Sequence, residues 1–135
     1  MRYTNIVTSF LKNQDKILIL KRSQDVKSMK GLWSGVSGVI ENQENPLKRA
    51  EIEIFEEIGI RTNEIKLLKS GDELDIISPQ YKNHKWHVFP FLFDTKKTEI
   101  KLNWENSDYK WIEIGELEKF ETVPSLENVL ARLIQ

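Results

Sequence analysis

The residue types best suited to chemistry gather in one stretch, Gly38–Ile60, which reads GVIENQENPLKRAEIEIFEEIGI. If its second half is helical, Glu53, Glu56 and Glu57 share one face, because positions i, i+3 and i+4 are neighbours on a helix surface. Like charges repel one another at such spacings, and a purely structural helix gains nothing from them. A bound divalent cation reverses the sign of this interaction, since hard ions take carboxylate oxygens. The stretch contains five carboxylates: Glu44, Glu51, Glu53, Glu56 and Glu57.

Local signals predict the limits of this helix. Asn45-Pro46 favours a start, because proline suits the first helical turn, and Gly59 favours an end. An apolar stripe is expected on the side opposite the glutamates, facing a core: Leu47, Ala50, Ile54 and Ile58. Upstream, Gly35 and Gly38 predict a bent strand or a ligand-facing turn, with simple turn geometry as the alternative.

The rest of the chain predicts strands on both sides of this helix and a closing helix. Pro90 indicates a sheet edge or a bulge, and Ser125 is a candidate N-cap for the last helix, whose inner face would hold Leu126, Val129, Leu130 and Leu133. Strands are expected at residues 4–10 and 16–22 (a hairpin), 64–78 (one or two strands), 84–95, 99–104 and 109–114, and the helix at 123–135. This order predicts an α/β sandwich with a mixed sheet, formed by a single domain over residues 1–135.

Composition narrows the functional classes. The chain has 135 residues, 20 basic and 21 acidic side chains and a net charge of −1, so no global attraction to nucleic acid or to an anionic membrane is implied. The absence of cysteine excludes disulfides and thiolate metal sites. No apolar run approaches the roughly 20 residues that span a bilayer, and the N-terminus lacks the apolar region of a signal peptide. The expected location is the cytoplasm.

The spacing of the acidic stretch resembles a known motif. Gly38-x5-Glu44-x7-Ile52-Glu53-Ile54-x-Glu56-Glu57-x-Gly59-Ile60 is similar to the Nudix box, apart from Ile52, where arginine is expected. The resemblance covers nearly the whole chain, because Arg22 and Gly31-Leu32-Trp33 look like the segment that precedes the box. Tyr109-Lys110-Trp111-Ile112 and Gly115-Glu116-Leu117 look like the late strand and turn of that family.

The resemblance implies the Nudix-type α/β/α sandwich with a mixed β-sheet and the activity usual in MutT-like proteins. That activity is Mg²⁺- or Mn²⁺-dependent hydrolysis of a nucleoside diphosphate linked to another group, by attack of water on phosphorus. Elementary chemistry agrees, because a carboxylate site binds a polyanionic diphosphate only through bridging cations. The implied partner is a small nucleoside diphosphate derivative, with no nucleic acid or membrane, bound by a monomer or homodimer.

The resemblance also assigns roles to single residues. Glu53, Glu56 and Glu57 are the expected metal ligands, joined by the backbone carbonyl near Gly38. Glu44 is expected either to act behind the direct metal ligands or to complete the metal network, and Glu44, Glu53 and Glu56 are the expected catalytic residues. The general base varies in this family, so Glu53, Glu56, Glu105 and Asp108 all stay candidates. For Glu105 and Asp108, an ordinary polar turn is the alternative.

Ile52 is the main departure from the pattern. On the helical wheel it lies away from the apolar stripe and borders Glu56, so core periodicity does not explain it. The arginine expected there would orient and partly neutralise the glutamates, with a bidentate geometry that is hard to replace. Arg49 lies at i−4 from Glu53, and we expect it to compensate in part.

Substrate contacts are expected from Arg22, Trp33, Glu105 and Asp108. Several aromatic residues are candidates for stacking on a base, although most aromatic residues at strand positions belong to a core: Trp33, Tyr81, Trp86, Phe89, Phe91 and Trp104. His84 and His87 point to opposite faces of a strand, so a site in which both bind one metal is not expected. Leu126 stands near the place where some oxidised-guanine triphosphatases use asparagine, which argues against that substrate.

Two functional classes follow. The first is a metal-dependent pyrophosphohydrolase. The second is a Nudix-fold nucleotide-binding or regulatory module with weak or no catalysis, which Ile52 favours. The three clustered glutamates favour the enzyme, because a simple binding module has little reason to keep like charges together. An RNA-binding protein is disfavoured by the absence of a basic stripe.

Overall fold

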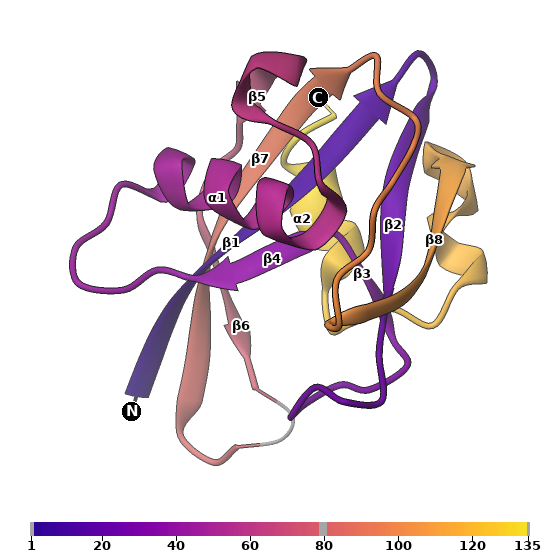
Figure 1. Cartoon of the computed structure of the whole chain (residues 1–135). Coiled ribbons are helices and arrows are strands. Elements are labelled where there is room, and N and C mark those ends of the chain that lie inside the picture. Colours follow the sequence, from indigo (N-terminus) through magenta and orange to yellow (C-terminus); the bar gives the residue numbers. More distant parts are fainter. Residues whose placement is uncertain (1, 79–80, 135) are drawn as a thin grey trace.

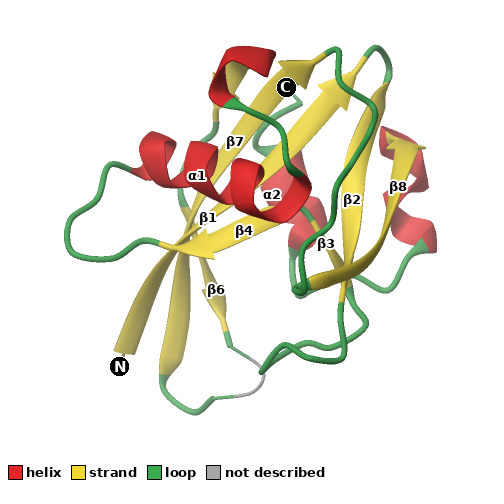
Figure 2. Ribbon diagram, in the orientation of Figure 1, coloured by secondary structure: helices red, strands yellow, loops and turns green. Residues whose placement is uncertain are grey.

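The computed structural model describes residues 2–78 and 81–134 and consists of one mixed sheet with helices on both faces (Figures 1 and 2). Helix α1 (Pro46–Ile58) crosses one face, and the short helix α2 (Leu126–Ala131) lies behind the sheet in the same view. Two 3₁₀ helices, η1 (Thr62–Glu64) and η2 (Ile114–Lys119), complete the helical elements of the described residues. The predicted α/β sandwich is confirmed.

The sheet contains eight strands, in which β3-β2-β1-β7-β5 form the main path. β4 pairs with β1, β6 with β7 and β8 with β2. The strands are β1 (Arg2–Asn13), β2 (Lys16–Arg22), β3 (Trp33–Ser34), β4 (Val36–Val39), β5 (Ile65–Ser70), β6 (Leu74–Ile77), β7 (His84–Thr95) and β8 (Asn106–Glu113). The predicted hairpin is confirmed as β1 and β2, and the predicted one or two strands at 64–78 are two.

The two longest strands, β1 and β7, run parallel, with Ile6 opposite Val88, whereas the other pairs are antiparallel. On its other side β1 changes partner: residues 6–9 pair with β4, and residues 12–13 pair with β2. β4, which contains Gly38, is thereby held directly beneath α1.

Two apolar clusters hold the layers together. One lies under α2 and includes Phe10, Val88 and Leu126. The other lies under α1 and includes Val7, Ile54 and Ile58. Each buried aliphatic or aromatic side chain contributes about 1.5–3 kcal/mol of transfer free energy, so both faces of the sheet are firmly covered. The predicted inner face of the last helix, Leu126, Val129, Leu130 and Leu133, is buried as expected.

Helix α1 has the limits that the sequence predicts. The Asn45 side chain accepts a hydrogen bond from the Lys48 backbone N–H at 3.2 Å, Pro46 occupies the first turn, and Gly59 ends the helix with a φ of 75°. The expectation that the glutamates lie on the side opposite the apolar stripe is wrong, however, for two of them. Glu53 and Glu57 are 8% and 3% exposed and face inward beside the apolar stripe.

Three other local predictions need correction. Residues 99–104 are not a strand, because this connector makes its backbone hydrogen bonds to the end of α1, from Lys101 N–H to the Ile58 carbonyl and from Asn103 N–H to the Glu57 carbonyl. Ser125 precedes α2 but adopts a left-handed conformation and makes no side-chain cap. The third is the expectation of a sheet edge or a bulge at Pro90.

Pro90 lies inside the sheet and not at its edge, since β7 pairs with β1 on one side and with β5 and β6 on the other. The Pro90 carbonyl accepts a hydrogen bond from Gly71 N–H, in the break between β5 and β6. The missing N–H of proline therefore faces a gap in the ladder, where it costs no strand hydrogen bond.

No helix among the described residues is long and apolar enough to cross a membrane.

Candidate active site

Three carboxylates meet where α1 contacts the connector that follows β7. One oxygen from each of Glu53, Glu57 and Glu105 lies within 4.8 Å of the other two. Glu53 and Glu57 project from successive turns of α1, and Glu105 comes from the segment just before β8. We call these three residues the α1 carboxylate cluster. In the described part of the chain it is the only group of this kind with the spacing to hold a metal ion.

Gly38 makes room for Glu53. A Cβ atom at this position would lie 2.3 Å from both Cγ and Cδ of Glu53, closer than any real contact allows. Neither Gly35 nor Gly38 has a positive φ, so turn geometry does not explain either residue. The close approach of neighbouring atoms explains both glycines, because a Cβ at Gly35 would likewise lie only 2.7 Å from the Ser9 carbonyl oxygen. The glycine of the motif therefore allows the glutamate side chain to lie flat against β4.

Two asparagines bring the connector to the helix. Asn106 Nδ2 donates to Glu57 Oε1 at 3.0 Å, across 49 positions of sequence. Asn103 Nδ2 donates to Glu105 Oε1 at 3.2 Å, and the Glu105 N–H donates to Asn103 Oδ1 at 3.0 Å. The Glu105 carbonyl also accepts from Ser23 N–H at 2.8 Å. Glu105 is thus a fixed part of the site, and sequence reasoning did not single out either asparagine.

The electrostatics of the cluster are unfavourable without an added positive charge. Burial raises the pKa of Glu57 well above its usual value, and the charge of Glu105 raises it further. Burial also raises the pKa of Glu53, although a hydrogen bond from Arg49 opposes the shift. Both side chains belong to the C-terminal half of α1, whose last turn contains no basic residue. The helix dipole favours cations at this end.

The donor set fits a hard divalent cation. Glu57 Oε2 is buried and has no hydrogen-bond partner among the described residues, an unusual state for a carboxylate oxygen. Carboxylate oxygens at this spacing are the ligands that Mg²⁺ and Mn²⁺ take, together with water and phosphate oxygens. The geometry therefore provides what the predicted metal site requires.

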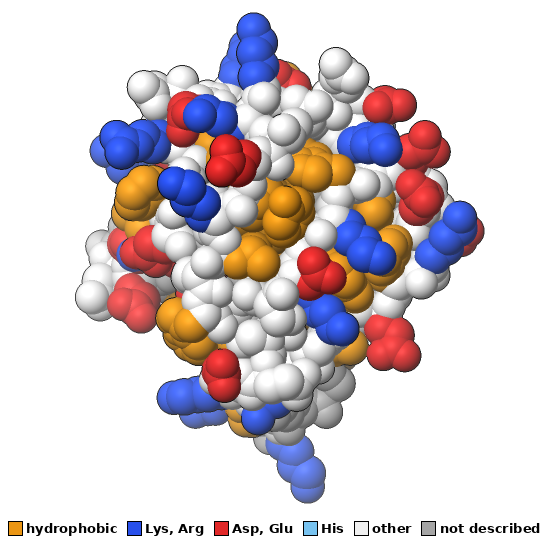
Figure 3. Space-filling model, turned by 45° about the vertical axis from the view of Figure 1, so that its right-hand side comes forward, with side chains coloured by type: hydrophobic (Ala, Val, Ile, Leu, Met, Phe, Trp, Pro, Cys, Tyr) orange, Lys and Arg blue, Asp and Glu red, His pale blue; other side chains and the backbone are white. Residues whose placement is uncertain are grey.

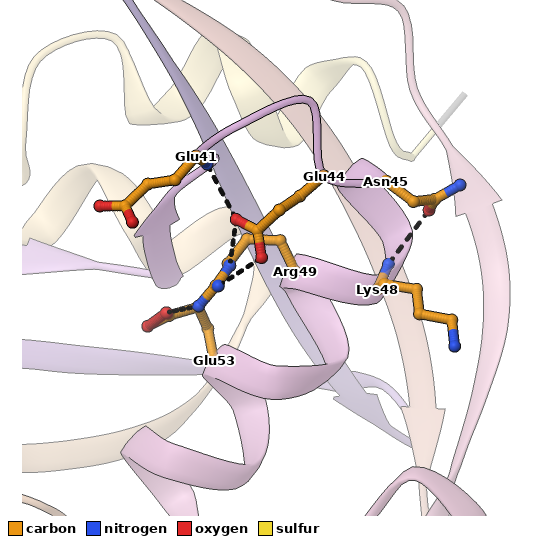
Figure 4. A network of polar contacts seen from close by, with 6 residues as sticks. All are labelled: Glu41, Glu44, Asn45, Lys48, Arg49 and Glu53. Atoms are coloured by element: carbon orange, nitrogen blue, oxygen red, sulfur yellow. Dashed lines mark hydrogen bonds and ion pairs between the residues drawn. The ribbon is translucent and has the colours of Figure 1, made fainter.

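Glu44 lies outside the cluster and is joined to it by Arg49. Arg49 forms ion pairs with Glu44, at 2.5 Å from Nη2 to Oε2, and with Glu53, at 3.1 Å from Nη1 to Oε2 (Figure 4). The expected contact between Arg49 and Glu53 is present. Glu56 is exposed and outside the cluster, although its charge raises the pKa of Glu53.

A cavity of about 330 Å³ opens beside the cluster. Its charged lining residues are Arg22, Glu53 and Glu105, and Gly38 also lines it. The Arg22 Nε and Nη2 atoms donate to the Ser28 carbonyl at 3.1 and 3.0 Å, which holds the guanidinium in place. Apolar walls come from β1, β6, β7 and the region of α2: Ile6, Ile76, Trp86, Val88, Val123, Pro124, Leu126 and Val129.

The predicted substrate contacts divide into two groups. Arg22 and Glu105 line the cavity. Trp33 does not line it, because its ring is buried in the core, edge-on to Phe120 at 5.3 Å between centroids. Asp108 is exposed on β8, where its Oδ1 accepts from the Tyr109 N–H, and it too is absent from the lining. Of the six stacking candidates, only Trp86 lines this cavity.

Comparison with known families identifies the family of this chain. Residues 2–133 match the model of the NUDIX domain. An RNA pyrophosphohydrolase of Bartonella henselae is 30% identical over 70% of this chain, which spans 60% of that protein. A dihydroneopterin triphosphate diphosphatase of Haemophilus influenzae is 27% identical over 83% of the chain and 77% of that protein. An 8-oxo-dGTP diphosphatase of Buchnera aphidicola is 29% identical over 89% and 85%.

Solved structures have the same fold. The MutT protein of Methanosarcina mazei Go1 superimposes with a TM-score of 0.76 over 97% of this chain and 92% of that one, at 21% identity. A C. elegans Ap4A hydrolase superimposes with a TM-score of 0.75 over 98% and 94%, at 16% identity.

The chain therefore belongs to the Nudix family. Within that family it is a hydrolase that acts on diphosphate bonds, in agreement with its MutT-like fold.

Proposed function

We propose that this Nudix hydrolase is a metal-dependent pyrophosphohydrolase that cleaves a nucleoside diphosphate linked to another group. The observation that carries the proposal is the α1 carboxylate cluster, whose three oxygens lie within 4.8 Å of one another beside a cavity that also contains Arg22. The names of the three relatives describe hydrolysis of diphosphate linkages on different carriers, so they support the reaction more than any one substrate.

In this proposal Glu53 and Glu57 hold the metal, with the Gly38 backbone beside them. Mg²⁺ or Mn²⁺, when bound, supplies a Lewis acid that offsets the repulsion between the diphosphate and the carboxylates. Arg22 then binds a phosphate oxygen, because its guanidinium is fixed by the Ser28 carbonyl and lines the same cavity. The apolar walls around Trp86 and Val88 exclude water and hold the organic part of the substrate.

Glu105 is the general base that we propose. Among the four candidates, Glu56 and Asp108 are exposed and do not line the cavity, and Glu53 is paired with Arg49. Glu105 lines the cavity, forms no direct ion pair among the described residues and is oriented by Asn103. It takes a proton from the attacking water as the new O–P bond forms and the anhydride P–O bond breaks. General-base catalysis of this kind contributes about 10²–10⁴-fold.

Cleavage of the diphosphate bond tests the proposal, and it is measured as the nucleoside monophosphate that forms from each substrate. Nucleoside triphosphates, nucleotide sugars, dinucleoside polyphosphates and ADP-ribose are each incubated with the protein in Mg²⁺, in Mn²⁺ and in EDTA. We expect metal-dependent hydrolysis of at least one class, and a loss of about 100-fold in Glu105→Gln. Glu51→Gln, on the same helix but outside the cluster and the cavity, is the matched control and should keep full activity.

The binding-module alternative predicts a different result. A nucleotide would then raise the melting temperature of the protein, yet no substrate class would yield a nucleoside monophosphate with either metal. That result, or metal-independent hydrolysis that survives Glu57→Gln, would contradict the proposed function.

A further inference from the structure

One guanidinium connects the loop before α1 to the carboxylate cluster. Arg49 Nε and Nη2 donate to Glu44 Oε1 and Oε2, at 3.1 and 2.5 Å, so the two side chains form a two-point fork. Its third contact runs from Nη1 to Glu53 Oε2 at 3.1 Å. Figure 4 shows Arg49 lying between the two glutamates. No other described residue donates a hydrogen bond to Glu53.

Glu44 is itself held by the backbone. Its Oε1 accepts from the Glu41 N–H at 2.8 Å, and its own N–H donates to the Glu41 carbonyl at 3.0 Å. The loop therefore fixes Glu44, Glu44 fixes Arg49 through the fork, and Arg49 fixes one oxygen of Glu53. Bidentate guanidinium–carboxylate pairs add geometric specificity to their energy, so the fork between Arg49 and Glu44 fixes the orientation of the guanidinium that contacts Glu53.

The helix position where the family motif leads us to expect arginine has no part in this arrangement. Ile52 is 41% exposed and offers no hydrogen bond to a carboxylate. Position 49 lies one turn before position 53, whereas position 52 lies one turn before Glu56. The guanidinium of this chain is therefore placed to act on Glu53, and Glu56 is left exposed without an ion pair among the described residues.

We propose that Arg49 is the positioning residue of this active site and that it replaces the arginine missing at position 52. It holds Glu53 in the space that Gly38 leaves, with one carboxylate oxygen bound to the guanidinium and the carboxylate as a whole directed at Glu57 and Glu105. Without Arg49, the Glu53 side chain turns away from the two like charges beside it. The inference rests on the proposed metal-dependent function and explains how the site works without the usual arginine.

The direct test compares Arg49→Ala with the wild-type protein by two readouts. Mn²⁺ binding to the protein without substrate is measured by electron paramagnetic resonance of the free ion, and kcat and KM are measured on the best substrate. Residues that orient metal ligands are worth about 10–100-fold in metal affinity or activity. We expect a loss of that size in Mn²⁺ affinity and in kcat, with a smaller change in the KM of the substrate.

Two further variants separate positioning from folding. Arg49→Lys keeps the charge and the aliphatic stem but cannot form the fork and reach Glu53 together, so we expect a loss between those of wild type and Arg49→Ala. Introducing Ile52→Arg into Arg49→Ala returns a guanidinium to the same helix surface, and we expect it to recover most of the lost Mn²⁺ affinity. Lys48→Ala, an exposed neighbour whose side chain makes no ion pair, is the control and should match wild type.

Two outcomes would overturn the inference. One is that Arg49→Lys and Arg49→Ala both have the same Mn²⁺ affinity and the same turnover as the wild-type protein. The other is a loss in Arg49→Ala that Ile52→Arg leaves unrepaired. Either result leaves the proposed function intact if wild type hydrolyses its substrate with metal. A wild-type protein that binds Mn²⁺ without hydrolysing anything would refute the proposed function alone, because the binding arm still reports on Arg49.

Discussion

Two groups of acidic residues in this protein use similar side chains to opposite effect. In the α1 carboxylate cluster, Glu53 and Glu57 are buried and share their space with Glu105. In the second group, which we call the His87 cluster, the imidazole lies between two carboxylates. Its Nδ1 is 2.6 Å from Asp75 Oδ1, and its Nε2 is 2.6 Å from Glu73 Oε1.

The difference lies in where the balancing positive charge comes from. In the His87 cluster the protein supplies it, because the hydrogen bonds that the ring donates to Asp75 and to Glu73 raise the pKa of His87. Solvent reaches all three side chains, which are 30–52% exposed. In the α1 carboxylate cluster Arg49 supplies positive charge to Glu53, but Glu57 Oε2 has no hydrogen-bond partner in the part of the chain that the structure describes. Charged groups that are paired with one another are typical of a structural feature. A buried carboxylate without a partner is typical of a ligand-binding site.

Among variants of the two clusters, Glu57→Gln should have the largest effect on activity. We expect turnover to fall by about 100-fold or more, because a direct metal ligand is worth at least as much as the residues that orient it. Protection of the fold by Mn²⁺, measured as a rise in melting temperature, should vanish in the same variant.

Without metal the effect of Glu57→Gln on stability should have the opposite sign. The folded-state pKa of Glu57 is raised, so ionising it costs stability as pH rises above the unfolded value of about 4.3. In EDTA at pH 7 the variant should therefore melt above wild type, and the difference should shrink toward pH 4. A lower melting temperature for the variant at pH 7 would contradict the electrostatic account.

Gly38→Ala should have an effect of intermediate size on activity, because it changes the position of Glu53 without changing any charge. The added methyl group would overlap the Glu53 side chain, which must move from its position in the cluster. We expect kcat to fall by about 10–100-fold, with a change in unfolding free energy of about 1 kcal/mol. Gly115→Ala is the matched control, since nothing lies within 4 Å of a Cβ there. Equal activity of the two variants would show that Glu53 does not need its present position.

His87→Gln should have the smallest effect, and only on stability. The raised pKa of His87 means that the paired imidazolium adds stability that is fully present below its unfolded pKa of about 6.5 and is lost as pH rises through the folded value. We expect the variant to be less stable by up to about 1 kcal/mol near pH 5.5, and equal to wild type by about pH 9. Denaturant unfolding at both pH values measures this.

The turnover of His87→Gln tests whether the His87 cluster differs in function from the α1 carboxylate cluster. His87→Gln should leave kcat unchanged, because His87 is not among the cavity-lining residues. A loss of turnover comparable to that of Gly38→Ala would mean that the His87 cluster is part of the catalytic machinery and that the comparison is wrong.

Local signals in the sequence predict α1 well. Asn45, Pro46 and Gly59 act on the backbone within one turn, so their effect does not depend on the rest of the fold. The i, i+4 relation of Arg49 to Glu53 is equally local, and the expected contact is present. Which edge of the acidic stripe faces the sheet is not a local property, and the structure turns Glu53 and Glu57 inward while Glu56 faces solvent.

The sandwich fold, the limits of the acidic helix and the presence of carboxylates at a metal-binding spacing are therefore predictable from the sequence, because each depends on periodicity or on residues within a few positions. The position of Glu105 beside Glu53 and Glu57, and that of Trp33 away from the cavity, are set by long-range packing. Those outcomes depend on a connector that folds onto the end of α1, through contacts such as Asn106 to Glu57, between residues 49 positions apart. No local pattern specifies a contact at that separation.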